Sequence, residues 1–350
     1  MPFLKNCWYA AGWAEEFGQD LVARQIIGKH LLLFRTADGS VTAISDTCPH
    51  RFAPLHKGKR VGDHVECPYH GLQFNADGRC VHNPHGDHAI PKAAFVERYP
   101  VVERDTLVWV WMGDRDRVDP SAIPDFSIAN DEKTWVHTKW LAMTMGISYE
   151  LITDNLLDLS HATYLHATLG NEALASGIID VRQDGNTVYS DRVGINDRPP
   201  LLFPAIGACK PDEKVDFWAD IRWDAPASFL LHSGVAPTGL DRADGSSLFS
   251  IQILTPETET RTRYIIRLMR NFNMENPAVS PAIEENVQAA FMTEDEPMIQ
   301  NVSDRMGGQD FWELNPILLA GDGGAVRARR IMAQLIEQEQ CGARPRAVGA

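Results

Sequence analysis

Short apolar runs separated by turn signals dominate the first third of the chain. The segment LVARQIIGKHLLLFRTADGSVTAISD carries strand-length runs around an ADG turn, and GLQFNADGRCV repeats that turn signal. TLVWVWMG adds a run rich in Trp and Val, residues that favour strands. The pattern therefore predicts a small all-β domain over residues 20–112.

Helical spacing appears only after GDRDRVDPSAIPDFS, whose prolines and acidic residues mark a domain boundary near 113–127. Leu151, Leu156 and Leu159 have helical spacing. Strand-like pieces follow (FLLHSGVAP, LFSIQILT, TRYIIRLMRNF), and then two helical stretches, PAIEENVQAAFMTEDEPMIQNVSDRM and VRARRIMAQLIEQEQ. We expect an α+β fold in which domain 1–118 is all-β and domain 119–350 packs helices on an antiparallel sheet.

Composition narrows the class of protein. A formal net charge of −14 argues against a nucleic-acid partner, because phosphate binding requires clustered Lys and Arg. The start, MPFLKNCWYAAGWAEEF, does not resemble a signal peptide, and runs such as IIGKHLLLF are too short to cross a membrane. We therefore expect a cytoplasmic protein whose six cysteines are free thiols or metal ligands.

The segment CPHRFAPLHKGKRVGDHVECPYHG holds the first candidate metal site. Cys48 and His50 form C-x-H, and Cys67 and His70 form C-x-x-H after an interval of sixteen residues. A Rieske centre requires two Cys on one iron and two His on the other, so each loop must supply one of each. The spacing favours a Rieske [2Fe–2S] cluster over the alternative, a structural zinc ion.

The segment DNLLDLSHATYLH holds the second candidate site. Asp154, Asp158 and His161 lie at i, i+4 and i+7, which predicts that they share one helix face. His161 and His166 are five residues apart, too wide for one metal ion on a regular helix. A π-bulge or a helix break near Ala162–Leu165 would bring them together.

Two imidazoles and one carboxylate form the facial triad of Fe(II) oxygenases. The segment MTEDEP offers three carboxylates late in a predicted helix, and spacing alone does not choose among Glu294, Asp295 and Glu296. A solvated acidic helix face is the alternative for all three.

The two motifs together resemble the terminal oxygenase component of the Rieske non-haem iron oxygenases. The resemblance spans essentially the whole chain. More narrowly, the chain resembles the vanillate O-demethylase group, which includes dicamba and toluenesulfonate methyl monooxygenases, in NCWYAAGW, CPHRFAPL, CPYHGLQF, YPVVERDTLVWVWMGD, DNLLDLSHATYLH and ILTPETET.

The resemblance implies roles for individual residues. His161, His166 and Asp295 are implied as the ligands of a mononuclear Fe(II). Asp158 is implied to hydrogen-bond His161 and to reach a Rieske histidine, His70, of a neighbouring subunit. Asn155 is a candidate outer-shell group, with helix capping or surface hydrogen bonding as the alternative.

The resemblance also implies an activity and an assembly. It implies a homotrimer with a helix-grip catalytic domain, which receives NAD(P)H electrons through a ferredoxin or a flavin reductase. The expected reaction is an O2-dependent O- or N-dealkylation of a substituted aromatic compound in catabolism, with release of an aldehyde. Ring cis-dihydroxylation and a Rieske electron carrier are the alternatives. The run NPILLAGDGGAV lacks the third glycine of a dinucleotide site, which agrees with a separate reductase.

The sequence constrains the substrate less. We expect an apolar pocket drawn from FLLHSGVAP, LFSIQILT and the helix before Asp295. His232, Gln252 and Asn286 are candidate polar contacts, with solvent-facing or internally bonded side chains as the alternative. The pattern leaves open whether the substrate is an aromatic acid or an uncharged aromatic.

Overall fold

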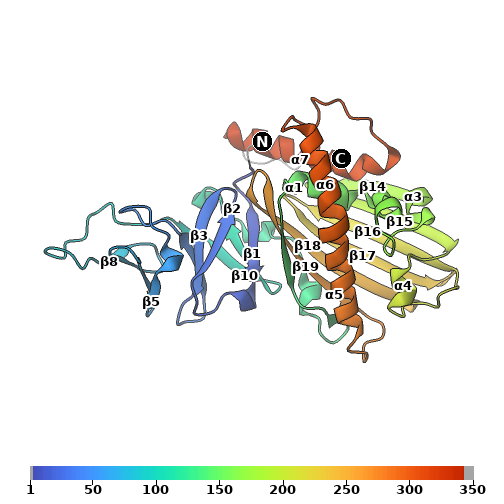
Figure 1. The fold of residues 1–350 in the computed structure, drawn as a ribbon, viewed down its shortest axis with the longest axis horizontal. Coiled ribbons are helices and arrows are strands. Elements are labelled where there is room, and N and C mark those ends of the chain that lie inside the picture. Colours follow the sequence, from blue (N-terminus) through green and yellow to red (C-terminus); the bar gives the residue numbers. More distant parts are fainter. Residues whose placement is uncertain (1–2, 343–350) are drawn as a thin grey trace. The chain divides into compact units, whose positions relative to one another are not determined.

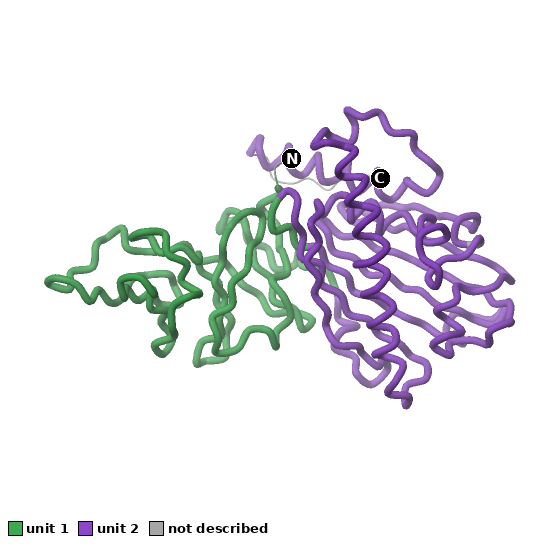
Figure 2. The backbone as a smooth tube through the Cα atoms, in the orientation of Figure 1, with its two compact units in different colours: residues 1, 3–125, 255–258 green, residues 2, 126–254, 259–350 purple. Residues whose placement is uncertain are grey.

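The computed structural model describes residues 3–342. The chain divides into two compact units, shown in Figure 2. The first contains residues 3–125 and 255–258, and the second contains residues 126–254 and 259–342. Within the described residues, no helix combines the length and apolar character that crossing a bilayer requires.

The first unit is all-β, as predicted, and its strands form three antiparallel sheets. The first sheet has the order β1 (Trp8–Trp13), β11 (Leu107–Trp111), β10 (Val101–Arg104). The second has the order β2 (Val22–Ile26), β3 (Lys29–Arg35), β4 (Val41–Ser45), β9 (Arg98–Tyr99). The third has the order β5 (Lys59–Val61), β6 (His64–Glu66), β7 (Gln73–Phe74), β8 (Cys80–His82).

The continuous apolar run LLLF lies in strand β3, which is buried on both faces. Leu31 and Leu33 pack into one apolar cluster, while Leu32 and Phe34 on the opposite face pack into another. A strand covered on both faces needs apolar residues at every position, which removes the usual alternation. The second cluster also contains Cys48 and Cys67, so the core of this unit extends under both metal-site loops.

The second unit is built on one eight-stranded antiparallel sheet. Its order is β12 (Val136–His137), β19 (Arg261–Arg270), β18 (Ser246–Thr258), β17 (Ser228–Pro237), β16 (Val215–Asp224), β15 (Thr187–Asp197), β14 (Ile178–Asp184), and β13 (Leu141–Met145) also pairs with β19. Strands β16 and β17 stay in register over ten residue pairs, from Val215↔Pro237 to Asp224↔Ser228. This long, regular pairing gives a rigid sheet, on which successive side chains of each strand alternate between the two faces.

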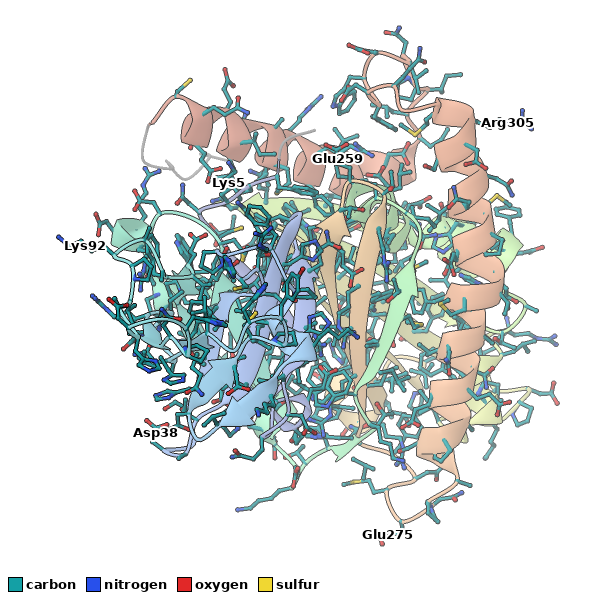
Figure 3. All side chains as sticks on the ribbon, turned by 60° about the vertical axis from the view of Figure 1, so that its left-hand side comes forward. Lys5, Asp38, Lys92, Glu259, Glu275 and Arg305 are labelled. Atoms are coloured by element: carbon teal, nitrogen blue, oxygen red, sulfur yellow. The ribbon has the colours of Figure 1, made fainter. Side chains whose placement is uncertain are left out.

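Helices complete this unit. They are α1 (Tyr149–Leu157), α2 (Ala162–Leu165), α3 (Glu172–Ser176), α4 (Leu202–Ala205), α5 (Val279–Ala289), α6 (Glu296–Met306) and α7 (Gly323–Gln340). A π-helical segment, Ala290–Asp295, joins α5 to α6. In Figure 1 the two helices run as one rod along the sheet, and Figure 3 labels Glu275 and Arg305 near its two ends. The predicted α+β fold and the predicted long helix are therefore confirmed.

A partly buried ion pair links α7 to α1. Arg329 is 9% exposed and donates from Nε and Nη2 to both carboxylate oxygens of Asp154, at 2.6–3.0 Å. Its Nη1 lies 3.6 Å from Glu150. Burial raises the pKa of the Asp154 carboxyl, and Arg329 opposes that rise. Asp154 is therefore a structural residue at the helix interface.

Arg329→Met should lower the free energy of unfolding by about 3–5 kcal/mol, because it leaves two partly buried carboxylates without their cation. Chemical denaturation monitored by circular dichroism measures the change. Arg330→Met is the matched control, since Arg330 is exposed on the same helix. Equal denaturation midpoints for the two variants would show that the pair does not stabilise the interface.

Candidate metal centres

Two loops of the first unit carry the C-x-H and C-x-x-H motifs and share one backbone design. Cys48 N–H donates to the carbonyl of Ala53, and Phe52 N–H donates back to the carbonyl of Cys48, both at 2.9 Å. Cys67 repeats the pattern with Leu72 at 2.8 Å and Gly71 at 3.1 Å. The fifth residue of each loop is left-handed, with φ 60° at Phe52 and φ 71° at Gly71. Both motifs therefore present their side chains from equivalent turns.

The side chains of these loops separate into a thiol pair and an imidazole pair. Cys48 and Cys67 are 1% and 2% exposed, whereas the rings of His50 and His70 lie nearer the surface with centroids 4.4 Å apart. Burial and the neighbouring Cys67 raise the pKa of the Cys48 thiol to about 11. Two adjacent buried thiolates need a cation, and the division into Cys and His pairs suits a Rieske [2Fe–2S] cluster.

Two further histidines support these loops from outside the motifs. His56 Nδ1 lies 2.5 Å from a carboxylate oxygen of the buried Asp46. His85 Nε2 lies 2.8 Å from the carbonyl oxygen of His70. Both contacts are local hydrogen bonds that hold the loops in place.

The second unit brings His161, His166 and Asp295 together. His166 Nε2 lies 3.3 Å from His161 Nε2 and 3.3 Å from Asp295 Oδ2, and His161 Nε2 lies 3.4 Å from Asp295 Oδ1. These three residues are called the His–His–Asp triangle below, and each offers a ligand atom that lies within 4.8 Å of the other two. Edges of this length suit three donor atoms facing one ion about 2 Å from each.

A helix break, not a π-bulge, brings the two histidines together. Helix α1 ends at Leu157, and Asp158 caps it with φ −106° and ψ 89°. A 3₁₀ turn, Leu159–His161, leads into the single turn α2, after which His166 is extended. The prediction that Asp154, Asp158 and His161 share one helix face is therefore wrong. The π segment lies instead at Ala290–Asp295, where its widened turn carries the carboxylate.

The two imidazoles are held in one tautomer. His161 Nδ1 contacts the carbonyl oxygen of Asp158, and His166 Nδ1 lies 2.6 Å from a carboxylate oxygen of Glu294. Each Nδ1–H donates to an oxygen, so each Nε2 lone pair points toward the centre of the triangle. This tautomer leaves both Nε2 atoms free to bind a metal ion.

Asp295 is 1% exposed and accepts a hydrogen bond from Asn155 Nδ2 at 2.9 Å. Burial favours a raised pKa for this carboxyl, but when His161 and His166 are protonated, their hydrogen bonds and charge outweigh burial and lower the pKa to about 2. The other two acidic candidates differ in position. Glu294 supports His166, and Glu296 accepts from the Gly146 backbone N–H at 3.3 Å. Spacing along the chain does not distinguish these three neighbours.

Glu294→Ala and Asn155→Ala should each weaken Fe(II) binding by about 10–100-fold, because each removes an outer-shell partner that orients a triangle residue. Competition with a coloured Fe(II) chelator measures the affinity. Glu285→Ala is the control, since Glu285 is exposed on α5. Unchanged iron affinity in both variants would show that the contacts of Glu294 and Asn155 do not contribute to metal binding.

Asp158 makes more contacts than the sequence indicated. Its carboxylate accepts from the Ser160 backbone N–H and from Arg192 Nη2, both at 3.0 Å. Arg192 is 1% exposed and also donates to the Leu174 carbonyl. The predicted contact with His161 uses the Asp158 carbonyl, whereas the predicted contact with His70 of a neighbouring subunit stays a prediction. Arg192 was missed, although it occupies an inward position of the alternating strand β15.

An apolar cavity of about 150 Å³ adjoins the triangle. The cavity is lined by strands β16–β19, by the helices around His161 and His166, and by α5 with the π-helical segment that follows it. Phe217, Leu231 and Phe291 are among the lining residues. The three segments predicted to form the pocket therefore all contribute. Among the predicted polar contacts, Gln252 lines the cavity.

His232 and Asn286 do not line the cavity, which corrects both predictions. Alternation along β17 places His232 on the opposite face, where its Nε2 accepts from Trp218 Nε1 and lies 3.1 Å from Ser247 Oγ. Burial lowers the pKa of His232 to about 4, so the ring is neutral and can accept. Asn286 donates to the Ala282 carbonyl within its own helix, at 2.8 Å.

Comparisons with known proteins agree with both centres. The profile of the vanillate O-demethylase oxygenase C-terminal domain matches residues 145–338, and the Rieske [2Fe–2S] domain profile matches residues 7–100. The chain belongs to the vanillate O-demethylase group of Rieske non-haem iron oxygenases. Members of this group bind a Rieske [2Fe–2S] cluster and a mononuclear iron, and the donor sets described above fit both.

Individual relatives align over nearly their full length. The oxygenase component of chloroacetanilide N-alkylformylase from Rhizorhabdus wittichii is 38% identical, over 96% of this chain and 97% of the relative. The oxygenase component of dicamba O-demethylase from Stenotrophomonas maltophilia is 35% identical, with 97% and 99% covered. A crystal structure of dicamba monooxygenase with non-haem iron and dicamba superposes with a TM-score of 0.84, 34% identity and coverage of 98% and 100%.

The Rieske oxygenase is therefore an oxidoreductase and the oxygenase component of a multicomponent system. The predicted family, fold and cofactors are confirmed. The Rieske electron carrier that the sequence left open is disfavoured, because such a carrier has no use for the second metal centre.

Proposed function

We propose that this Rieske oxygenase is the terminal oxygenase that removes an alkyl group from the oxygen or nitrogen of a substituted aromatic compound. The observation that carries the proposal is the His–His–Asp triangle beside an apolar cavity of about 150 Å³. Relatives named for O-demethylation and for N-alkylformylase activity support dealkylation over ring dihydroxylation.

The proposal assigns residues to each cofactor. Cys48, His50, Cys67 and His70 hold the cluster in domain 1–118, and the His–His–Asp triangle holds the iron in domain 119–350. When bound, the cluster and the iron supply electron transfer and O2 activation. Asn155 and Glu294 keep the triangle residues in place, and the apolar walls of the cavity exclude water from the reacting carbon.

The overall reaction balances with external electrons. One oxygen atom of O2 enters a C–H bond next to the substrate oxygen or nitrogen, and the other leaves as water after uptake of two electrons and two protons. The resulting hemiacetal or hemiaminal breaks its C–O or C–N bond and releases an aldehyde. The electrons come from NAD(P)H through a separate reductase, with or without a ferredoxin. A homotrimer, with Asp158 reaching His70 of a neighbouring subunit, and a cytoplasmic location complete the proposal.

Product analysis tests this function. The holoenzyme, supplied with NADH and a heterologous Rieske-oxygenase reductase, should convert N-methyl and O-methyl aromatics to formaldehyde and the dealkylated ring in equal amounts. The aldehyde is trapped as a hydrazone and quantified beside the aromatic product. Formation of a cis-diol without aldehyde would show that the enzyme dihydroxylates the ring, and it would contradict the proposed dealkylation.

A further inference from the structure

Asp158 is held through one of its two carboxylate oxygens. Its Oδ1 accepts from the Ser160 backbone N–H and from Arg192 Nη2, both at 3.0 Å, and from the Ser160 hydroxyl at 2.5 Å. Its Oδ2 accepts no hydrogen bond from any side chain or backbone group within residues 3–342. The side chain is 27% exposed and borders a surface groove that Ile317 also lines. The second oxygen is therefore available to a donor outside this chain.

Arg192 is the cation that fixes the first oxygen. It lies on β15 with 1% of its surface exposed, and its Nη1 donates to the Leu174 carbonyl while its Nη2 holds Asp158, both at 3.0 Å. Burial lowers the pKa of Arg192, and the charges of Asp158 and Asp322 oppose that change. Because the planar guanidinium is anchored at two of its nitrogens, it offers Asp158 a donor in one fixed direction.

Gly321 lies against this ion pair from a third side. A Cβ atom built on Gly321 would lie 2.9 Å from Asp158 Oδ1 and 3.0 Å from Arg192 Nη2. Real Cβ atoms essentially never come closer than 3.0 Å to another heavy atom, so a methyl group here must shift the carboxylate or the guanidinium. The carboxylate is thus confined by β15, by the 3₁₀ turn Leu159–His161 and by the backbone at Gly321.

We propose that Arg192 is a positioning residue for electron transfer, which holds Asp158 Oδ1 so that Asp158 Oδ2 faces the imidazole N–H of His70 of a neighbouring subunit. In this step one electron leaves the reduced cluster, which becomes oxidised, and reduces Fe(III) at the His–His–Asp triangle to Fe(II). His161 continues the path on the triangle side, because its Nδ1 contacts the Asp158 carbonyl oxygen. The inference rests on the contact between Asp158 and His70 in the proposed function.

A single-electron measurement tests this role without any substrate. The holoenzyme is prepared with an oxidised cluster and Fe(III), fewer electrons than chains are supplied by flash photoreduction with deazaflavin, and the cluster absorbance reports its reoxidation. Arg192→Met and Asp158→Asn should each slow the transfer by about 10–100-fold, as expected when a group that orients a metal-site partner is lost. Iron and acid-labile sulfide per chain should stay at the wild-type values, because neither substitution removes a ligand.

Companion variants separate position from charge. Gly321→Ala keeps both charged groups but crowds them, so it should slow the transfer and displace the Asp158 carboxylate in a crystal structure, and it tests the role even where Arg192→Met does not fold. Arg192→Met combined with Asp158→Asn should be no slower than Asp158→Asn alone, since Arg192 acts through Asp158. Arg182→Met is the matched control and should keep the wild-type rate, because Arg182 forms an exposed pair with Asp191 between β14 and β15.

The outcomes separate Arg192 from the electron path that it serves. Wild-type rates in Arg192→Met and Gly321→Ala, additive losses in the double variant, or loss of iron from Arg192→Met would overturn the positioning role. Slow transfer in Gly321→Ala with the Asp158 carboxylate in its original place would overturn it as well. A wild-type rate in Asp158→Asn, or no transfer in the wild type, would instead overturn the contact between Asp158 and His70. Aldehyde release in the product analysis decides dealkylation independently of all of these.

Discussion

His166→Ala should abolish substrate turnover and remove the mononuclear iron while the Rieske cluster stays intact. His166 supplies one corner of the His–His–Asp triangle and its Nδ1 is fixed by Glu294, so the substitution removes a direct ligand rather than a supporting contact. The loss of iron affinity and turnover should exceed the roughly 100-fold effect of losing an outer-shell partner. Iron analysis, acid-labile sulfide and turnover measure the three consequences on one preparation.

His30→Ala is the control for this variant, because His30 is exposed on β3 and belongs to neither donor set. It should keep the full iron content. His161→Ala should reproduce the phenotype of His166→Ala, since the two Nε2 atoms lie 3.3 Å apart on the same triangle. Iron retained at the wild-type level in both histidine variants would place the mononuclear iron elsewhere.

Cys67→Ala should eliminate the cluster and with it all turnover driven by a reductase. Cys67 is 2% exposed and lies in the same apolar cluster as Cys48, so truncating its side chain also creates a cavity in the core of the first unit. Acid-labile sulfide should fall from about two per chain to none, and the Rieske absorption bands should vanish. The thermal midpoint of the protein should fall as well.

Cys341→Ala is the matched control, because Cys341 is exposed after the end of α7. It should keep the sulfide content and the colour of the wild type. Full sulfide content in Cys67→Ala would contradict the assignment of this thiol to the cluster.

The first metal centre could be predicted in detail because its determinants are local. Each loop carries its Cys and His within a few residues, and the Cys-Pro and left-handed positions that shape the turn lie beside them. Of these, Gly71 signals its conformation directly, whereas Phe52 adopts the same φ without any sign in the sequence. The paired backbone design emerges only in three dimensions.

The second centre could be predicted only in part because its determinants are distant. The two histidines are close in sequence, but their partner carboxylate lies about 130 residues later in a run of three acids. The end of α1 at Leu157 depends on the backbone of Asp158, which helical periodicity does not show. Arg192 reaches Asp158 from a strand 34 residues away, so no local motif links them.

The substrate cavity was the least predictable feature. The segments were identified correctly, but a one-residue step along a strand reverses the face on which a side chain lies. His232 therefore lies on the opposite face of the sheet, while Ser250, which the sequence did not single out, lines the cavity, and its hydroxyl has no hydrogen-bond partner among residues 3–342. Strand register across β16–β18 decides this, and register is a long-range property.

Metal content tests the central claim most directly. The protein should be purified anaerobically, assayed for iron and acid-labile sulfide, and examined by EPR after dithionite reduction. A [2Fe–2S] cluster plus one mononuclear iron predicts about three irons and two sulfides per chain with a Rieske-type signal. Zinc without sulfide, and no EPR signal, would contradict both metal centres.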